Sequence, residues 1–270
     1  TMYEMFSRLS MPFSEQKKLF DYAKDRGIEI FSTPFDFESV DFLESLGVNL
    51  YKIASMDLVN LPLIDYVAKT QKPIILSTGM SNLGLIEDSL NVIAKSGNSN
   101  VALLHCNSTY PAAAEDMNIE AINTLKKCFN LPVGLSDHTF GLLVSTVALS
   151  IGSNIIERHF TLSKTQEGPD HILSSEPDEM TRLVEISKTI NDILGDGIKR
   201  VKTSEYDTIN LQQKSLYAIQ DIKKGQIINK EMLTVKGPSG GILPKYLNIV
   251  DGRVALRNIL TDYPITWNDI

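Results

Sequence analysis

The sequence predicts an α/β fold, a (β/α)8 TIM barrel followed by a small β-rich domain. Over residues 1–200, short apolar runs rich in β-branched residues alternate with longer amphipathic segments, as they do in successive βα units. After about residue 200 the helical periodicity stops and Gly/Pro-rich turns become frequent. The first pattern predicts parallel strands linked by helices, and the second predicts a separate domain.

Six runs are expected to be parallel strands, because their centres are apolar on both faces. They are residues 28–34, 50–55, 73–79, 101–108, 132–139 and 154–160. The segments beside them have apolar residues at i, i+3 and i+4 spacing and are expected to be helices. These helices are residues 11–27, 37–47, 61–71, 85–97, 118–130, 141–152 and 177–197, with Gly47 as a C-cap glycine.

Polar residues at the strand ends favour a barrel over an open sheet. In an open sheet ligand-binding groups concentrate at one switch point, whereas all strand ends of a barrel face one mouth. No Gly-rich dinucleotide motif follows any strand. The polar strand-end residues are Thr33, Lys52, Ser55, Ser77, Thr78, Asn107, Ser108, Ser136, His138, Glu157 and His159.

The strand count and the tail define the expected domains. A closed barrel needs eight strands and six are counted, so two βα units are expected upstream of Thr1, in a longer protein. The partial barrel is expected to span 1–200, with a polar linker at 201–208. Residues 209–270 are expected to form the small domain, which includes a Gly/Pro-rich loop at 237–246.

The composition excludes several partners. A net charge of -7 argues against binding to nucleic acid or anionic lipid. No apolar stretch is long enough to cross a membrane. Cys106 is expected at a strand end and Cys128 in a helix, both as free thiols, which indicates a reducing compartment and a cytoplasmic protein.

His138 and His159 end two successive strands and are candidate metal ligands. Two imidazoles without a protein carboxylate make an exchangeable site, which suits Mn²⁺ or Mg²⁺ with substrate oxygens better than structural zinc. Alternatively, each histidine is a hydrogen-bonding residue without a metal. Asp137, between Ser136 and His138, is a candidate either to support a metal ligand from behind or to cap a helix.

A lysine and several hydroxyls form a candidate anion-binding cluster. Lys52 supplies charge and the hydroxyls supply donors, which together suit a phosphate and a carboxylate. The alternative is that these serines cap the helices that follow. The hydroxyl-bearing members are Ser55, Ser77, Thr78, Ser108 and Ser136.

The loop after the last barrel strand carries a further candidate. Gly168 and Pro169 favour a tight loop that holds Asp170 over the mouth, where it either binds substrate hydroxyls or is solvated. His105 is expected to be a hydrogen-bonded core residue, and His171 part of the loop.

Taken together, the motifs resemble the sialic acid synthases, which condense phosphoenolpyruvate (PEP) with an amino-sugar aldehyde. The resemblance covers nearly the whole chain, and the tail is similar to the antifreeze-like (SAF) domain of that family, a β-clip fold. Its motifs are STPFD (32–36), YKIAS (51–55), PIILSTGM (73–80), LLHCNSTYP (103–111), GLSDHT (134–139), IIERHFT (155–161), GPDH (168–171) and VKGPSGGI (235–242).

The resemblance implies roles for individual residues. His138 and His159 would bind Mn²⁺ or another divalent metal, and Glu157 and Asp170 would act near the reacting centre. The implied product is a nine-carbon nonulosonic acid, with phosphate released by C–O cleavage, and the implied assembly is a domain-swapped homodimer. The substrate-binding residues implied are Thr33, Lys52, Ser55, Ser77, Asn107, Ser108, Tyr110 and Ser136.

Two departures from the family pattern leave alternatives open. An acidic residue and a phosphate-binding lysine of the family lie upstream of Thr1. Gly237 replaces the arginine that reaches the acceptor from the partner subunit, so the acceptor could be that of a legionaminic- or pseudaminic-type synthase. The alternatives are a synthase of 3-deoxy-ulosonates, which generally lack this tail, and a non-catalytic sugar- or metal-binding protein derived from a truncated synthase.

Overall fold

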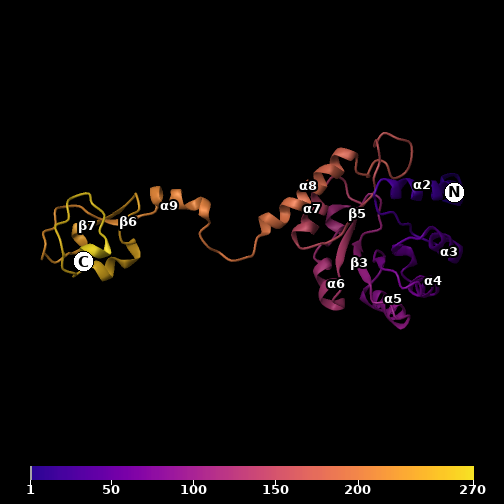
Figure 1. Cartoon of the computed structure of the whole chain (residues 1–270), viewed down its shortest axis with the longest axis horizontal. Coiled ribbons are helices and arrows are strands. Elements are labelled where there is room, and N and C mark those ends of the chain that lie inside the picture. The colour runs from indigo at the N-terminus through magenta and orange to yellow at the C-terminus, as the bar shows by residue number, and fades with distance from the viewer. Residues whose placement is uncertain (1) are drawn as a thin grey trace. The chain divides into compact units, whose positions relative to one another are not determined.

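The computed structural model describes residues 2–270, which divide into two compact units. One unit spans Thr1–Gly195 and the other Asp196–Ile270 (Figure 1). Each unit encloses its own cluster of buried apolar side chains.

The first unit is built on a parallel sheet curled into half of a barrel (Figure 1). The strand order follows the chain order, so the sheet has no switch point at which the order reverses. This confirms the predicted barrel-type fold. The strands are β1 (Tyr51–Ile53), β2 (Ile74–Ser77), β3 (Val101–Cys106), β4 (Val133–Asp137) and β5 (Ile156–Arg158).

Helices precede the first strand, connect successive strands and follow the last one. Helix α3 illustrates the local signals: Asp36 accepts a 2.7 Å bond from the Ser39 N–H at its start, and Gly47 ends it at φ 73°. The C-terminal end of α3 therefore matches the predicted C-cap at Gly47. The helices are α1 (Met2–Leu9), α2 (Phe13–Asp25), α3 (Phe37–Leu46), α4 (Leu61–Ala68), α5 (Leu83–Lys95), α6 (Ala121–Phe129), α7 (Leu143–Ser150) and α8 (Pro177–Leu194).

The core lies where the sheet packs against the helices. Leu103 of β3, Leu135 of β4 and Ile64 of α4 are completely buried within it. Cys106 ends β3 and Cys128 lies in α6, and both are free thiols as predicted. Burial of this apolar surface is the main force that fixes the strand ends in place.

The segment 28–34 is not a strand, so the count of six strands is wrong by one. The Ile28 N–H bonds back to the Ala23 carbonyl at 3.0 Å rather than to a neighbouring strand. Ile28 is 66% exposed. A strand exists only with a paired neighbour, and the apolar pattern of 28–34 cannot supply the backbone pairing with β1.

The second unit is small and β-rich. Strand β6 (Ser215–Ala218) pairs antiparallel with β7 (Leu233–Lys236), and isolated bridges tie in later segments. Short helices α9 (Tyr206–Gln212) and α10 (Leu247–Val250) complete it.

Among residues 2–270, no helix combines the length and the apolar character that a membrane span requires.

Candidate active site

A polar cavity of about 280 Å³ lies at the carboxyl ends of the five strands. Alternate residues of a strand point to the same face, so Ser136 and His138 enter the cavity together, as do Glu157 and His159. The register pairs Ser136 directly with Glu157. The lining residues are Lys52, Ala54, Ser55, Met56, Ser77, Met80, Cys106, Ser108, Tyr110, Ser136, His138, Glu157 and His159.

Glu157 joins the positive and the hydroxyl groups of the cavity. One oxygen lies 3.1 Å from Lys52 Nζ, and the other accepts a 2.6 Å bond from the Ser136 hydroxyl. The Lys52 side chain is only 11% exposed, so its charge is largely desolvated and Glu157 compensates for it. An anionic ligand that binds Lys52 would replace Glu157 as the partner of the lysine.

The His138 ring is held by a backbone carbonyl. Its Nδ1 donates a 2.7 Å bond to the Asn107 carbonyl, and the Cys106 thiol lies 3.9 Å from the same nitrogen. Burial opposes the charged ring, but the bonds with Cys106 and Asn107 and the charge of Glu157 raise the pKa of His138 above its usual value. With Nδ1 occupied, Nε2, which lies 3.4 Å from the Ser136 hydroxyl, is the nitrogen that a ligand could bind.

The His159 ring faces His138 edge-on, with ring centroids 5.3 Å apart. Its Nδ1 lies 3.4 Å from the Asp170 carboxylate, on the predicted loop. Burial lowers the pKa of His159 and outweighs the attraction of Asp170, so the neutral ring is favoured. The centroid of the Tyr110 ring lies 4.2 Å from that of His138 and 5.7 Å from that of His159, so Tyr110 closes this side of the cavity.

Gly79 lets the hydroxyls on the opposite wall approach the backbone. A side chain at this position would lie 2.9 Å from Ser55 Oγ and closer still to Ser108 Oγ. The Gly79 N–H donates a 3.0 Å bond to Ser55 Oγ. Ser77 Oγ is buried and has no hydrogen-bond partner, although it lines the cavity. A bound ligand or a water molecule in the cavity would supply the partner that this buried hydroxyl lacks.

Four of the predicted polar residues lie outside this cavity lining. The Thr78 hydroxyl bonds to the Leu104 carbonyl at 2.9 Å, so it stabilises the sheet. Asn107 bonds through its side chain to Thr109 and contributes its carbonyl to His138. Asp170 contacts the cavity through His159. Thr33 is half-buried on the unpaired segment 28–34 and does not line the cavity.

The two histidines fit a divalent metal by their orientation. Each ring has its Nδ1 against an oxygen, from Asn107 or Asp170, so Nε2 is the nitrogen that each ring would offer to a metal. In His138 this nitrogen lies 3.4 Å from the Ser136 hydroxyl, a long contact that a metal would replace. Within residues 2–270 no group of three or more His, Cys, Asp or Glu side chains is arranged to hold a metal ion. Oxygen atoms from a substrate or water would therefore have to complete the coordination shell.

Two models of known protein families match this chain. Residues 1–199 match the model of the NeuB family, and residues 213–270 match the SAF domain. The chain belongs to the NeuB family. This confirms the resemblance to sialic acid synthases and the predicted SAF domain in the tail.

Other NeuB relatives extend the comparison. The chain is 44% identical to the N,N'-diacetyllegionaminic acid synthase of Campylobacter jejuni, over 96% of this chain and 78% of the relative. It is 33% identical to the pseudaminic acid synthase of Helicobacter pylori, over 100% of this chain and 79% of the relative. These relatives are nonulosonate synthases, which are transferases, so the predicted enzyme class is confirmed.

A solved NeuB-type structure supports the same fold. The N-acetylneuraminic acid synthetase of Leptospira borgpetersenii serovar Hardjo-bovis, in complex with citrate, superposes with a TM-score of 0.69 at 35% identity. The match covers 74% of this chain and 70% of that one.

Arg158 of this NeuB-family chain was not predicted from the sequence, and Asp137 does not cap a helix. Asp137 instead forms an ion pair with Arg158 on the face of the sheet opposite the cavity. The sequence did contain a signal for this ion pair. Asp137 and Arg158 alternate with the site residues on neighbouring strands, and the register pairs them with each other. His105 bonds to the Met117 carbonyl at 2.6 Å, as predicted.

Proposed function

We propose that the chain catalyses condensation of PEP with an N-acetylated amino-sugar aldehyde and water, to give a nonulosonic acid and phosphate. The observation that carries the proposal is the convergence of Lys52, the unpartnered Ser77 hydroxyl and two imidazoles on one cavity. A cation with hydroxyl donors suits the phosphate and carboxylate of PEP. The histidine pair suits an aldehyde bound through a metal.

The bond changes are simple to assign. C3 of PEP forms a carbon–carbon bond to the aldehyde carbon, whose oxygen takes up a proton. Water then adds to the cationic C2 and loses a proton. The bond between C2 and the bridging oxygen breaks with its electron pair on the oxygen, and the C2 hydroxyl gives its proton to the departing phosphate, which leaves a C2 ketone. Mn²⁺ or Mg²⁺ at His138 and His159 would supply Lewis-acid polarisation of the aldehyde.

The residues of the chain would position and deprotonate the reactants. Lys52 and the Ser55, Ser77 and Ser108 hydroxyls would hold the PEP anion. When Lys52 pairs with PEP, Glu157 becomes free to accept the proton of the attacking water.

The acceptor side of the cavity is assigned by neighbours of the histidines. Asp170, held beside His159, would bind acceptor hydroxyls, and the Tyr110 ring would cover the acceptor carbon chain. Thr33 and Asn107 remain proposed contributors to substrate binding at the rim of the site.

The acceptor is proposed to be a 6-deoxy di-N-acetyl hexose of the legionaminic type. The 44% identity to a legionaminic acid synthase supports this, as does Gly237 at the position of the family arginine. The enzyme would act as a cytoplasmic, domain-swapped homodimer. The SAF domain argues against a 3-deoxy-ulosonate synthase, and the presence of Lys52, Ser77 and both histidines in one cavity argues against a non-catalytic protein.

An acceptor screen of the full-length protein tests the proposal. Phosphate release from PEP is measured with N-acetylmannosamine and with 6-deoxy di-N-acetyl hexoses, for the wild type, His138→Ala and His159→Ala. We expect Mn²⁺-dependent release with the second acceptor class and none from either variant. Release by both variants at the wild-type rate would refute the metal assignment. No release with any acceptor would favour a non-catalytic protein.

A further inference from the structure

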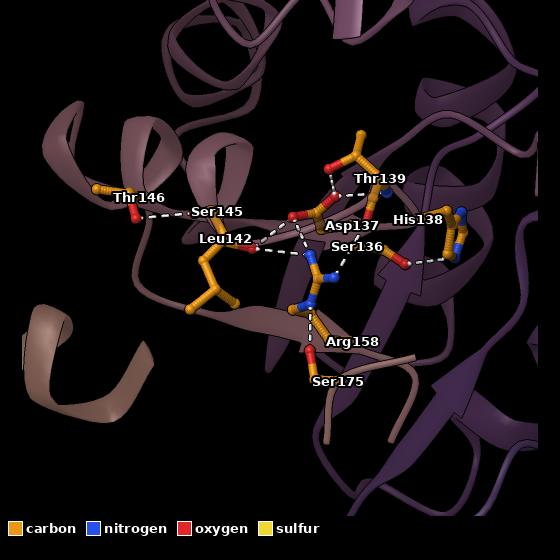
Figure 2. Close-up of polar contacts among 9 residues, drawn as sticks. All are labelled: Ser136, Asp137, His138, Thr139, Leu142, Ser145, Thr146, Arg158 and Ser175. Atoms are coloured by element: carbon orange, nitrogen blue, oxygen red, sulfur yellow. Dashed lines mark hydrogen bonds and ion pairs between the residues drawn. The ribbon is translucent and has the colours of Figure 1, made fainter. Parts of the chain in front are cut away.

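The face of the sheet opposite the cavity carries a buried ionic network between β4 and β5 (Figure 2). Arg158 and Asp137 form an ion pair, and their side chains are only 2% and 0% exposed. Both are residues that directly precede a site histidine. The network therefore lies next to His138 and His159 in the chain, although it is behind them in space.

Arg158 makes hydrogen bonds in three directions, which use the whole guanidinium fork (Figure 2). Nη1 donates to Asp137, Nη2 donates to the Thr139 carbonyl at 3.0 Å, and Nε donates to the Ser175 hydroxyl at 2.8 Å. Only arginine presents donors in this fixed planar geometry. Thr139 is the residue that follows His138, so one end of the fork fixes that strand end.

The other end of the fork binds Ser175, which in turn contacts the backbone of His159. The Ser175 N–H donates a 2.7 Å bond to the His159 carbonyl, and the Ser175 carbonyl accepts a 3.0 Å bond from the Thr161 N–H. These bonds close the base of the loop that carries Asp170, the partner of His159 Nδ1. Ser175 thus links Arg158 to His159 and to the Asp170 loop.

Asp137 is held equally firmly on its own side. Its oxygens accept bonds from the Thr139 N–H at 2.9 Å, from the Thr139 hydroxyl at 2.7 Å and from the Ser145 hydroxyl of α7. Burial of an ion pair contributes little to stability compared with apolar packing, because both charges lose their hydration. The directional bonds instead fix the positions of the groups that they join.

We propose that Arg158 is a positioning residue that sets the separation and orientation of the His138 and His159 rings, acting through Asp137, Thr139 and Ser175. The inference rests on the proposed function in that the two rings are the metal pair. It extends the site to side chains that contact neither substrate nor metal. Loss of the fork would let the ends of β4 and β5 move relative to each other.

The test compares three variants of the full-length protein. Arg158→Lys keeps the charge but lacks the planar fork, and Ser175→Ala removes only the hydroxyl that Arg158 Nε binds, while the backbone bond from Ser175 to His159 stays. Ser89→Ala is the matched control: its buried hydroxyl bonds to the Leu58 and Leu85 carbonyls, on elements that do not carry the site histidines. Each variant is measured for thermal stability, Mn²⁺ affinity and NMR signals of ring-labelled histidine.

We expect Arg158→Lys and Ser175→Ala to shift the His138 and His159 ring signals and to leave that of His105 unchanged. We also expect Mn²⁺ affinity to fall on the order of 10-fold, since loss of an outer-shell partner of a metal site typically costs 10–100-fold. Ser89→Ala should lower stability only. If the ring signals of both variants match the wild type, the network is only structural and the inference is wrong.

The ring signals separate this outcome from failure of the proposed function. If the wild type does not bind Mn²⁺, the metal assignment fails. The shifts of the His138 and His159 signals then still decide whether Arg158 positions these rings. If Arg158→Lys does not fold, Ser175→Ala gives the same decision.

Discussion

Gly134 of β4 packs directly against Ile155, the residue that precedes β5, and Gly134→Ala should therefore disturb the histidine pair. An added Cβ would lie 2.6 Å from Ile155 Cβ, 2.8 Å from Leu104 Cδ2, and closer still to the Ile155 carbonyl. Real Cβ contacts are almost never below 3.0 Å, so β5 must retreat by at least about 0.4 Å. That carbonyl also accepts a 2.8 Å bond from the Leu135 N–H, which the retreat would weaken.

The expected cost of this overpacking is about 2–3 kcal/mol, which corresponds to a fall in Tm of roughly 5–10 °C for the first unit. Thermal unfolding followed by circular dichroism measures it, together with the rate of phosphate release. Gly84→Ala is the control, because its Cβ would meet only Asn82 Oδ1, at 3.4 Å, in the first turn of α5. Equal stability of Gly134→Ala and the wild type would refute the argument from strand approach.

Three further predictions concern the hydroxyl wall, the metal and the second unit. Ser77→Ala should leave the Tm of the ligand-free protein nearly unchanged, because the Ser77 hydroxyl has no partner, but should raise the KM for PEP roughly 10-fold or more. Calorimetry and steady-state kinetics measure the two effects, and a lower Tm with an unchanged KM would contradict the prediction. Chelation should abolish phosphate release and Mn²⁺ should restore it, whereas persistent activity in the metal-free protein would contradict the assignment. Burial opposes the charge of Asp269, but Arg257 and Thr266 outweigh it and lower its pKa. The stability that it contributes should therefore be present above about pH 4 and be lost as the pH falls, and Asp269→Asn should remove this dependence in acid unfolding of the second unit.

The sequence was sufficient to predict the strands that carry the site. Buried parallel strands have a recognisable apolar pattern, and polar residues at their ends predicted the cavity at Lys52, Ser77 and His138. The chain-order sheet then follows from the barrel architecture.

Other features depend on contacts that a pattern does not encode. The run 28–34 has a strand-like composition, but pairing needs a neighbour with free backbone groups in register. Thr78 follows Ser77 at a strand end, but alternation turns its hydroxyl toward Leu104. Arg158 is one residue from both Glu157 and His159 in the sequence, and only the structure reveals that it faces the opposite side of the sheet.

The central claim is that this cavity condenses PEP with an aldehyde and releases phosphate by cleavage of the carbon–oxygen bond. The most direct measurement uses PEP labelled with ¹⁸O at the bridging oxygen, incubated with the full-length protein, Mn²⁺ and a 6-deoxy di-N-acetyl hexose. Mass spectrometry of both products should find the label in the released phosphate. Label retained in the nine-carbon product would contradict the account.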